Sequence, residues 1–359
     1  MNKKHTQLIG IIEGFFGRSW SWEDRKNYAQ FLAQNAYDFY IYAPKSDKNL
    51  RTLWQQDWPS ETKDQLSDLR ETYRSANVQF GIGLSPHEIY LDNSRDQRDR
   101  LNKRIQQINQ LEPDILCILF DDMRGDIPDL AQIQIDIAHQ AAETSNAKKI
   151  IFCPTYYSFD PVLERVFGNM PENYWQTFSQ HLDKNIDMFW TGEKVCSTQY
   201  PTQHLEQVTE LIGRKPFLWD NYPVNDGAVK SNILQLRAFD QSHSQLAEKV
   251  AGHAVNPMNQ AWLSKIPLAS LPLAYQQREN YSAETAFFRT CTDLCGETLT
   301  NQLQKDVNLL QDAGLKKMTE QERQALRIAY QKFGSNPYAQ EILAWLNDEY
   351  LFDPACLTE

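Results

Sequence analysis

Ile-Leu-Cys-Ile-Leu-Phe-Asp-Asp-Met-Arg-Gly-Asp, residues 115–126, is the stretch that decides the fold. Its first six residues are apolar and partly β-branched, and Pro113 and Gly125 bound it. A short apolar run of this kind is typical of a strand buried on both faces, as in a parallel sheet. Two carboxylates, Asp121 and Asp122, follow the strand directly. An aspartate after a strand is often only a turn residue or a helix N-cap. The pair alone therefore does not indicate a functional site, and the rest of the chain must be considered.

The two carboxylates suit acid–base chemistry if they can reach one ligand. Adjacent like charges repel, so the pKa of one carboxyl tends to rise. Paired acids with split pKa values are what acid–base catalysis needs. Neighbouring side chains in a regular strand point to opposite faces. Asp121 and Asp122 can therefore serve one substrate only if the backbone turns at the strand end, which Gly125 and Pro128 permit.

A pattern of short apolar run, polar motif and amphipathic helix recurs along the chain. Strands are expected at residues 8–13, 38–42, 78–84, 115–120, 149–153, 186–190, 216–219 and 250–255. Helices are expected at residues 21–35, 60–76, 94–110, 129–144, 202–212 and near 231–239, and at 261–274 with interruptions at Pro267 and Pro272. A long excursion follows the fifth strand and ends near residue 182. Eight strand-then-helix units in about 275 residues predict an α/β fold, the (β/α)8 TIM barrel.

After the eighth unit the pattern changes to helices only. These are expected at residues 282–294, 298–313, 319–332 and 338–347. We therefore predict a barrel over residues 1–279 and a C-terminal α-helical region over residues 280–359. The amphipathic spacing of these helices does not decide whether they cover the barrel or form a homodimer contact.

Composition restricts the classes of partner. The chain has 359 residues, of which 41% are hydrophobic, and a formal net charge of −11. No basic patch stands out, so neither nucleic acid nor an anionic membrane surface is an expected partner. No run approaches the ~18 apolar residues of a membrane span, and the N-terminus lacks the features of a signal peptide. These features predict a cytoplasmic protein with reduced cysteines.

Neither a metal nor a cofactor is expected. The six cysteines include one pair four residues apart, Cys291 and Cys295, without the second pair that would complete a zinc site. The seven histidines are scattered. There is no glycine-rich loop of the kind that binds phosphate.

Polar motifs rich in Gly and Pro follow most of the expected strands, at the end of the barrel where active sites of this fold lie. These motifs carry Gly14, Lys45, Asp121, Asp122, Tyr157, Trp219, Asn221, Asp226 and Asn256. Turn chemistry alone explains any one of them. It explains less well why most of these strands end in residues able to hydrogen-bond a sugar. Aromatic residues make up 12% of the chain, which fits either stacking on sugar faces or a large core.

Six motifs at the expected strand ends resemble those of one enzyme family. They are Glu-Gly-Phe-Phe-Gly-Arg-Ser-Trp (13–20), Tyr-Ala-Pro-Lys (42–45), Leu-Phe-Asp-Asp (119–122), Phe-Cys-Pro-Thr-Tyr-Tyr (152–157), Trp-Thr-Gly-Glu-Lys-Val (190–195) and Trp-Asp-Asn-Tyr-Pro-Val-Asn-Asp (219–226). In this order they resemble glycoside hydrolase family 84. That family includes protein O-GlcNAcases and bacterial β-N-acetylglucosaminidases, some labelled hyaluronidase. The resemblance covers roughly residues 10–263.

The resemblance implies a retaining mechanism without an enzyme nucleophile. The substrate's own 2-acetamido oxygen attacks the anomeric carbon and forms an oxazoline. By motif position, Asp121 would accept the acetamido N–H, and Asp122 would be the general acid and then the general base. Tyr157 would hydrogen-bond the acetamido oxygen as the oxazoline forms.

The other matched residues would bind the sugar. Trp219 and Cys153 would lie at the acetyl group, and Asn221 would support the acetamido group. The hydroxyl groups would be bound by Asp226, Lys45, Asn256 and the backbone of Gly14.

The expected activity is that of an exo-β-N-acetylglucosaminidase acting on a glycoside or glycoprotein that contains N-acetylglucosamine. One alternative is an endo-acting hydrolase of hyaluronan-type chains, against which a deep pocket closed by Asp226 and Asn256 argues. Another is a protein that binds N-acetylglucosamine without turnover, against which the presence of Asp121, Asp122 and Tyr157 argues.

Overall fold

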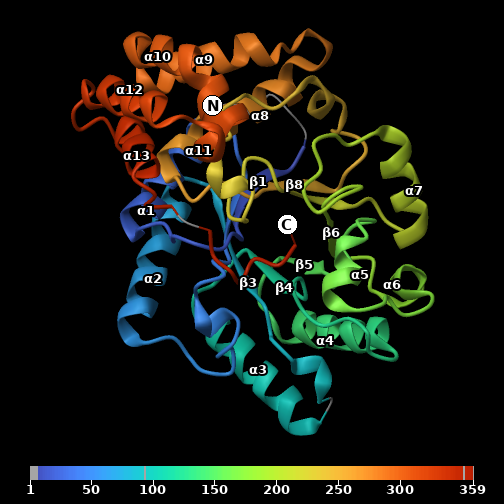
Figure 1. The fold of residues 1–359 in the computed structure, drawn as a ribbon. Helices are drawn as coiled ribbons and strands as arrows, with labels where there is room; N and C mark the ends of the chain where they lie inside the picture. The colour runs from blue at the N-terminus through green and yellow to red at the C-terminus, as the bar shows by residue number, and fades with distance from the viewer. Residues whose placement is uncertain (1–6, 93, 351, 359) are drawn as a thin grey trace.

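The computed structural model describes residues 7–92, 94–350 and 352–358. The expected absence of a signal segment concerns, in part, residues 1–6, which lie outside these ranges. Eight parallel strands close into a barrel in chain order, and β1 also pairs with β8 (Figure 1). The strands are β1 (Ile9–Glu13), β2 (Phe39–Tyr42), β3 (Gln79–Leu84), β4 (Ile115–Leu119), β5 (Lys149–Cys153), β6 (Ile186–Trp190), β7 (Phe217–Asp220) and β8 (Gly252–Val255).

The helices surround the barrel and continue beyond it. Those up to the end of the barrel are α1 (Trp22–Gln34), α2 (Ser60–Ser75), α3 (Arg95–Asn109), α4 (Leu130–Thr144), α5 (Val162–Phe167), α6 (Tyr174–His181), α7 (Thr202–Ile212) and α8 (Ala261–Gln277). Short 3-10 helices are η1 (Lys48–Leu50), η2 (Ile89–Leu91), η3 (Lys230–Asn232), η4 (Gln241–Gln245) and η5 (Arg278–Asn280). The C-terminal helices are α9 (Ala283–Cys295), α10 (Glu297–Val307), the π-helical η6 (Asn308–Ala313), α11 (Gly314–Lys317), α12 (Glu320–Gln331) and α13 (Pro337–Leu346).

The predicted (β/α)8 barrel with C-terminal helices is confirmed. All eight strands lie where they were expected, with ends that differ by at most two residues. The sequence identifies these strands because each is a short apolar run between turn residues. The excursion after β5 contains α5 and α6, which the sequence pattern did not separate.

The prediction of a helix near residues 231–239 is wrong. The segment between η3 and η4 is irregular, and its backbone N–H groups bond to residues far along the chain. Leu234 N–H donates to the carbonyl oxygen of Leu310 at 2.9 Å. The N–H groups of Leu236 and Arg237 both donate to the side-chain oxygen of Gln311, at 2.8 and 3.0 Å. These partners replace the i−4 carbonyls that a helix would supply.

The expected interruptions at Pro267 and Pro272 are also wrong, because α8 runs through both prolines. Pro272 has no N–H, so the carbonyl of Leu268 loses its helical donor. The hydroxyl of Tyr37 donates to that carbonyl at 2.7 Å. A side chain from the barrel thus satisfies the group that proline leaves unpaired.

Glycines make room for large rings inside the barrel. Phe39 of β2 and Phe217 of β7 lie 5.9 Å apart between ring centroids, although their strands are not neighbours, so both rings fill the interior. A Cβ on Gly10 would lie 2.2 Å from the ring of Phe39, and one on Gly252 would lie 2.3 Å from that of Phe217. Large side chains on some strands are therefore matched by glycine on others.

The apolar side chains form two buried clusters. The first fills the barrel and the helices around it, and the second joins α8 and the segment before it to the C-terminal helices. Helix α8 contributes to both, with Leu268 in the first cluster and Leu263 in the second. Because the second cluster begins at Leu234, the last barrel unit shares a core with the C-terminal helices. The division at residue 279 stays a prediction, as does a homodimer through these helices. Within the described ranges, no helix has the length and apolar character needed to cross a membrane.

Candidate active site

A cavity lies at the carboxyl ends of the barrel strands, and all ten sequence-predicted site residues line it. They are Gly14, Lys45, Asp121, Asp122, Cys153, Tyr157, Trp219, Asn221, Asp226 and Asn256. Seven further residues complete the lining, namely Phe16, Thr191, Val195, Cys196, Val224, Cys356 and Thr358. Phe16, Thr191, Val195 and Val224 lie within the motifs quoted above, so position in a motif was a signal for them. No sequence signal pointed to Cys356 or Thr358.

The two aspartates after β4 reach the same cavity because the backbone turns between them. Asp122 has φ of 58°, in the left-handed region that residues other than glycine seldom adopt. The turn is therefore at Asp122 itself rather than at Gly125 or Pro128. Holding a residue there costs roughly 1–3 kcal/mol, a cost that is common at functional sites.

Lys45, which follows β2, contacts both carboxylates. Its Nζ donates to Oδ2 of Asp121 and lies 3.5 Å from Oδ2 of Asp122. Burial alone would lower the pKa of Lys45, but the two carboxylates outweigh burial and raise it. The ammonium group is thus held charged between the acids.

The charge environment separates Asp122 from an ordinary exposed aspartate. Burial raises the pKa of Asp122, the charge of Lys45 opposes this effect, and the neighbouring Asp121 adds to it, so the pKa is raised overall. Asp122 therefore keeps its proton to a higher pH than an exposed aspartate does. That is the property a general acid needs.

Asp121 has one carboxylate oxygen without a partner. Its Oδ2 accepts from Lys45, whereas its Oδ1 is buried and has no hydrogen-bond partner among the described residues. A buried acceptor left unpaired costs roughly 1–3 kcal/mol, so native structures pair most of them. An N–H donor on a bound molecule would satisfy this oxygen.

Tyr157 and Cys153 come from the end of β5, and both stay protonated. Burial raises the pKa of the Tyr157 hydroxyl well above its usual value, and the charges of Asp122 and Asp121 raise it further. Burial likewise raises the pKa of the Cys153 thiol. Tyr157 is therefore a hydrogen-bond donor, and Cys153 is a neutral wall rather than a thiolate nucleophile.

The ends of β7, β8 and β1 are joined by a hydrogen-bonded chain. Asn221 Oδ1 accepts from Trp219 Nε1 at 3.1 Å and from Asn256 Nδ2 at 3.0 Å, and its Nδ2 donates to the carbonyl of Val195 at 2.8 Å. Asn256 Oδ1 accepts the N–H of Gly14 at 3.2 Å. A Cβ on Gly14 would lie 2.4 Å from the ring of Trp219, so only glycine fits there.

Asp226 lies in the loop after β7 and is 9% exposed. Its Oδ2 accepts the backbone N–H of Phe16 at 2.8 Å. This bond ties the loop after β7 to the loop after β1. The Asp226 carboxylate lines the cavity, as does Asn256.

Within the described residues, no group of three or more His, Cys, Asp or Glu side chains is placed to hold a metal ion. The polar groups that line the cavity include carboxylates, an ammonium group, a phenol and amides.

The family model for β-N-acetylglucosaminidase matches residues 9–308. The chain belongs to this family. The match spans all eight strands and every cavity residue up to Asn256. The resemblance to glycoside hydrolase family 84 is thereby confirmed.

Relatives of this β-N-acetylglucosaminidase-family chain include the protein O-GlcNAcases of Mus musculus and Rattus norvegicus. They are 27% and 28% identical to it over 286 and 283 residues, which in each case is 76% of this chain. The chain spans only 30% of the length of either relative. Among solved structures, a mutant of the Thermobaculum terrenum O-GlcNAc hydrolase matches with a TM-score of 0.77 and 28% identity, over 96% of this chain and 75% of that one. The structure of CpGH84B, 24% identical, shows the same fold with a TM-score of 0.74 over 96% of this chain and 61% of that one.

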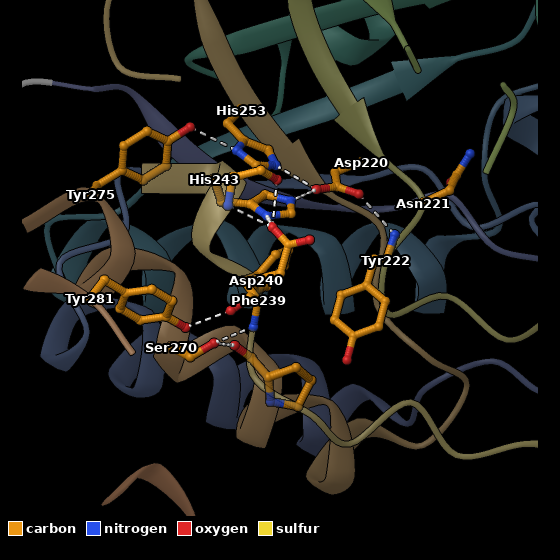
Figure 2. Close-up of polar contacts among 12 residues, drawn as sticks. Asp220, Asn221, Tyr222, Phe239, Asp240, His243, His253, Ser270, Tyr275 and Tyr281 are labelled. Atoms are coloured by element: carbon orange, nitrogen blue, oxygen red, sulfur yellow. Dashed lines mark hydrogen bonds and ion pairs between the residues drawn. The ribbon is translucent and has the colours of Figure 1, made fainter. Parts of the chain in front are cut away.

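Behind the cavity, the family's Trp-Asp-Asn motif is supported by a buried network that sequence reasoning missed (Figure 2). Asp220 is fully buried between two histidine rings, with Oδ2 at 3.1 Å from His243 Nε2 and 3.0 Å from His253 Nε2. The Nδ1 of His253 lies 2.9 Å from the hydroxyl of Tyr275, which can donate to it. Asp220 is thereby fixed between Trp219 and Asn221, both of which line the cavity.

The two histidines of this network differ in charge. His243 faces Asp220 with one ring nitrogen and Asp240 with the other, so both nitrogens must donate. Although burial opposes it, these carboxylates raise the pKa of His243 to about 9. Burial lowers the pKa of His253, which leaves that ring neutral. Asp220 keeps a pKa well below its usual range because its bonds to the two histidines outweigh burial.

We expect His243→Gln to destabilise the fold in a pH-dependent way. The folded-state pKa of about 9 lies above the usual value near 6.5, so the charged ring stabilises the fold fully below pH 6.5. The stabilisation is lost as pH rises through about 9. The cost of the substitution should therefore be larger at pH 6 than at pH 10, by roughly 2–3 kcal/mol. Urea unfolding at both pH values measures it, with the exposed His181→Gln as control. A cost that is equal at both pH values would contradict the assignment.

Proposed function

We propose that the chain is a retaining exo-β-N-acetylglucosaminidase of the O-GlcNAcase type. Its substrate would be a glycoside or glycoprotein with a terminal β-linked N-acetylglucosamine. The observation that carries the proposal is the Asp121–Asp122 pair, which enters one cavity because of the turn at Asp122 and leaves Oδ1 of Asp121 without a partner. Family membership supports the same conclusion.

In the first step, the substrate's acetamido oxygen attacks the anomeric carbon as the bond to the leaving oxygen breaks. Asp122 donates its proton to that oxygen, for which its raised pKa suits it. Asp121 accepts the acetamido N–H through Oδ1 and stabilises the positive charge that develops on the amide. The products of this step are the protonated oxazoline, which keeps the acetamido N–H bonded to Asp121, and the free alcohol.

In the second step, water opens the oxazoline at the anomeric carbon. The ionised Asp122 now removes a proton from the water, and the acetamido group is released. Two inversions at one carbon give net retention, so the first product is the β-hemiacetal. Asp122 ends the cycle protonated, as it began.

Tyr157 and the β7 residues would hold the acetamido group for this attack. The Tyr157 hydroxyl keeps its proton and can donate to the acetamido oxygen. Trp219 and Cys153 give the acetyl methyl an apolar wall, and the neutral thiol does not compete as a nucleophile. Correct orientation of the attacking acetamido group lowers the activation free energy by several kcal/mol, and by roughly 7–11 kcal/mol in the best intramolecular reactions.

The positions of Asp226 and Asn256 support exo rather than endo action. Both residues line the cavity and are largely buried, so they would close it beyond the terminal sugar. Both polar atoms of the Asn256 side chain already bond, to Gly14 and Asn221, so its task is to hold these residues in place. The Asp226 carboxylate, which accepts the backbone N–H of Phe16, would bind sugar hydroxyls at this position.

The test compares two glycosides and follows the product. Hydrolysis of 4-nitrophenyl β-N-acetylglucosaminide should release the β-hemiacetal first by proton NMR, whereas the β-glucoside, which lacks the acetamido group, should react at least roughly 100-fold more slowly. Chitin and hyaluronan oligosaccharides test the endo alternative through the sizes of their products. Binding of a thiazoline sugar without turnover of any of these substrates would show a binding protein instead.

A further inference from the structure

The segment Phe352–Thr358 contributes two residues to the lining of the cavity that holds the candidate catalytic residues. Cys356 and Thr358 belong to the lining that contains Asp121 and Asp122. In Figure 1 the red segment next to the C mark lies within the ring of strand labels, away from α13, which precedes it in sequence. The last described residues have therefore left the helical region and returned to the barrel.

The segment has the alternation of an extended chain at the cavity. Cys356 and Thr358 are partly buried, whereas Leu357 between them is 53% exposed. Alternate side chains of an extended segment point to opposite sides, so the two lining residues face inward together. A turn precedes them, in which Cys356 N–H donates to the carbonyl of Asp353 at 3.0 Å.

Arg18 fixes the chain leading to this segment to the loop after β1. Its Nη1 donates to the Glu349 carboxylate at 3.3 Å, and its guanidinium carbon lies 4.9 Å from the centroid of the Tyr350 ring. Arg18 follows Gly17 in a loop whose Gly14 and Phe16 line the cavity. The approach of the segment is thus set by the loop that forms one wall of the site.

With the segment in place, the cavity is too small for the proposed substrate. Its volume is about 50 Å³, room for a few water molecules rather than for a sugar ring with its acetamido group. A substrate that carries an aglycone must also leave space for that group at the cavity mouth.

We propose that the segment Phe352–Thr358 is an autoinhibitory plug that must move away before a glycoside can bind. The proposal rests on the proposed function for its substrate. The plug acts on binding rather than on chemistry, because none of its residues is needed for proton transfer. Apparent affinity then falls by the fraction of molecules in which the segment has moved.

The test compares the full chain with a chain that ends at Tyr350. Removal of the segment should lower KM for 4-nitrophenyl β-N-acetylglucosaminide roughly 10-fold with kcat unchanged, as for a closed-to-open ratio of about ten. The affinity for a thiazoline sugar, measured by calorimetry, should rise by the same factor. A synthetic peptide of residues 351–359 should inhibit the shortened chain competitively, and a peptide with glutamate in place of Cys356 and Thr358 should inhibit it less.

Two substitutions in the full chain complete the test. Arg18→Ala should lower KM in the same direction, because it releases the segment without removing it. Leu357→Ser alters a side chain that points away from the cavity and should leave KM at the value of the full chain.

The outcomes separate the two proposals. Equal thiazoline affinity in the full and shortened chains, with unchanged thermal unfolding, would overturn the plug. Absence of turnover in both chains would overturn the proposed activity, and the thiazoline comparison would still decide on the plug.

Discussion

Asp122→Asn is expected to lower kcat/KM for 4-nitrophenyl β-N-acetylglucosaminide roughly 100-fold or more. Asparagine matches the shape of aspartate but can neither donate a proton to the leaving oxygen nor accept one from water. The left-handed backbone at Asp122 tolerates asparagine well, so the turn that aims the side chain should survive. Steady-state kinetics at neutral pH measures the loss.

The dependence on leaving group tests the role assigned to Asp122. A 2,4-dinitrophenyl substrate leaves without protonation, so its first step should be affected much less. Breakdown of the oxazoline then limits the rate, and azide, which needs no general base, should restore turnover and yield the β-glycosyl azide. Asp121→Asn should lose activity without rescue by azide, because Asp121 orients the acetamido group rather than moving a proton to or from the leaving group or water.

The matched control is Asp126→Asn in the same loop. Asp126 is exposed and pairs with Arg124 at 2.5 Å on the surface. Its substitution should leave kcat/KM within a factor of about two, since surface pairs contribute little. Equal losses in Asp122→Asn and Asp126→Asn, or no loss in either, would refute the assigned role.

Local sequence patterns were sufficient for most of the fold. The strands are apolar runs that end in turn residues, and a barrel brings the ends of all parallel strands to one face. This is why residues as distant as Gly14 and Asn256 could be assigned to one site, and both line the cavity. Their roles toward a substrate are still predictions.

Features that depend on contacts between distant segments could not be predicted from local patterns. The segment near residues 231–239 has a helical pattern, yet its N–H groups bond to Leu310 and Gln311, more than 70 residues away. The prolines of α8 were expected to interrupt it because the donor that compensates for Pro272 comes from Tyr37. The local sequence of neither segment shows which distant residue will bond to it.

Some features of the candidate active site could not be predicted from local sequence patterns either. The turn was expected to depend on Gly125 and Pro128, because both residue types are common in turns, but it lies at Asp122, which adopts left-handed backbone although it is not a glycine. The buried Asp220–His243–His253 network joins residues that lie far apart in sequence. Glu13 is another acidic residue at a strand end, but its carboxylate is bound by the buried Arg25 and does not line the cavity.

Arg25→Met is expected to lower the free energy of unfolding by roughly 3–5 kcal/mol. Glu13 ends β1 and is fully buried, and Arg25 of α1 holds its carboxylate with two bonds of 2.6 and 2.9 Å. The guanidinium group also lies 4.7 Å from the ring centroid of Trp22 and 5.1 Å from that of Tyr42. Methionine fills part of the space but leaves a buried negative charge whose remaining bond is to the hydroxyl of Tyr40, at 2.5 Å.

Urea unfolding of two further variants separates charge from packing. The double variant Glu13→Gln with Arg25→Met should recover most of the loss, because no charge remains buried and glutamine can still accept from Tyr40. Lys26→Met removes the next residue's ion pair with Asp68, whose carboxylate side chain is 62% exposed, and should cost less than about 1 kcal/mol. If the double variant were as unstable as Arg25→Met alone, packing against the rings rather than the uncompensated charge would be the source of the loss. Because Glu13 immediately precedes Gly14, a confirmed charge effect would mean that this ion pair holds the strand end on which the cavity wall depends.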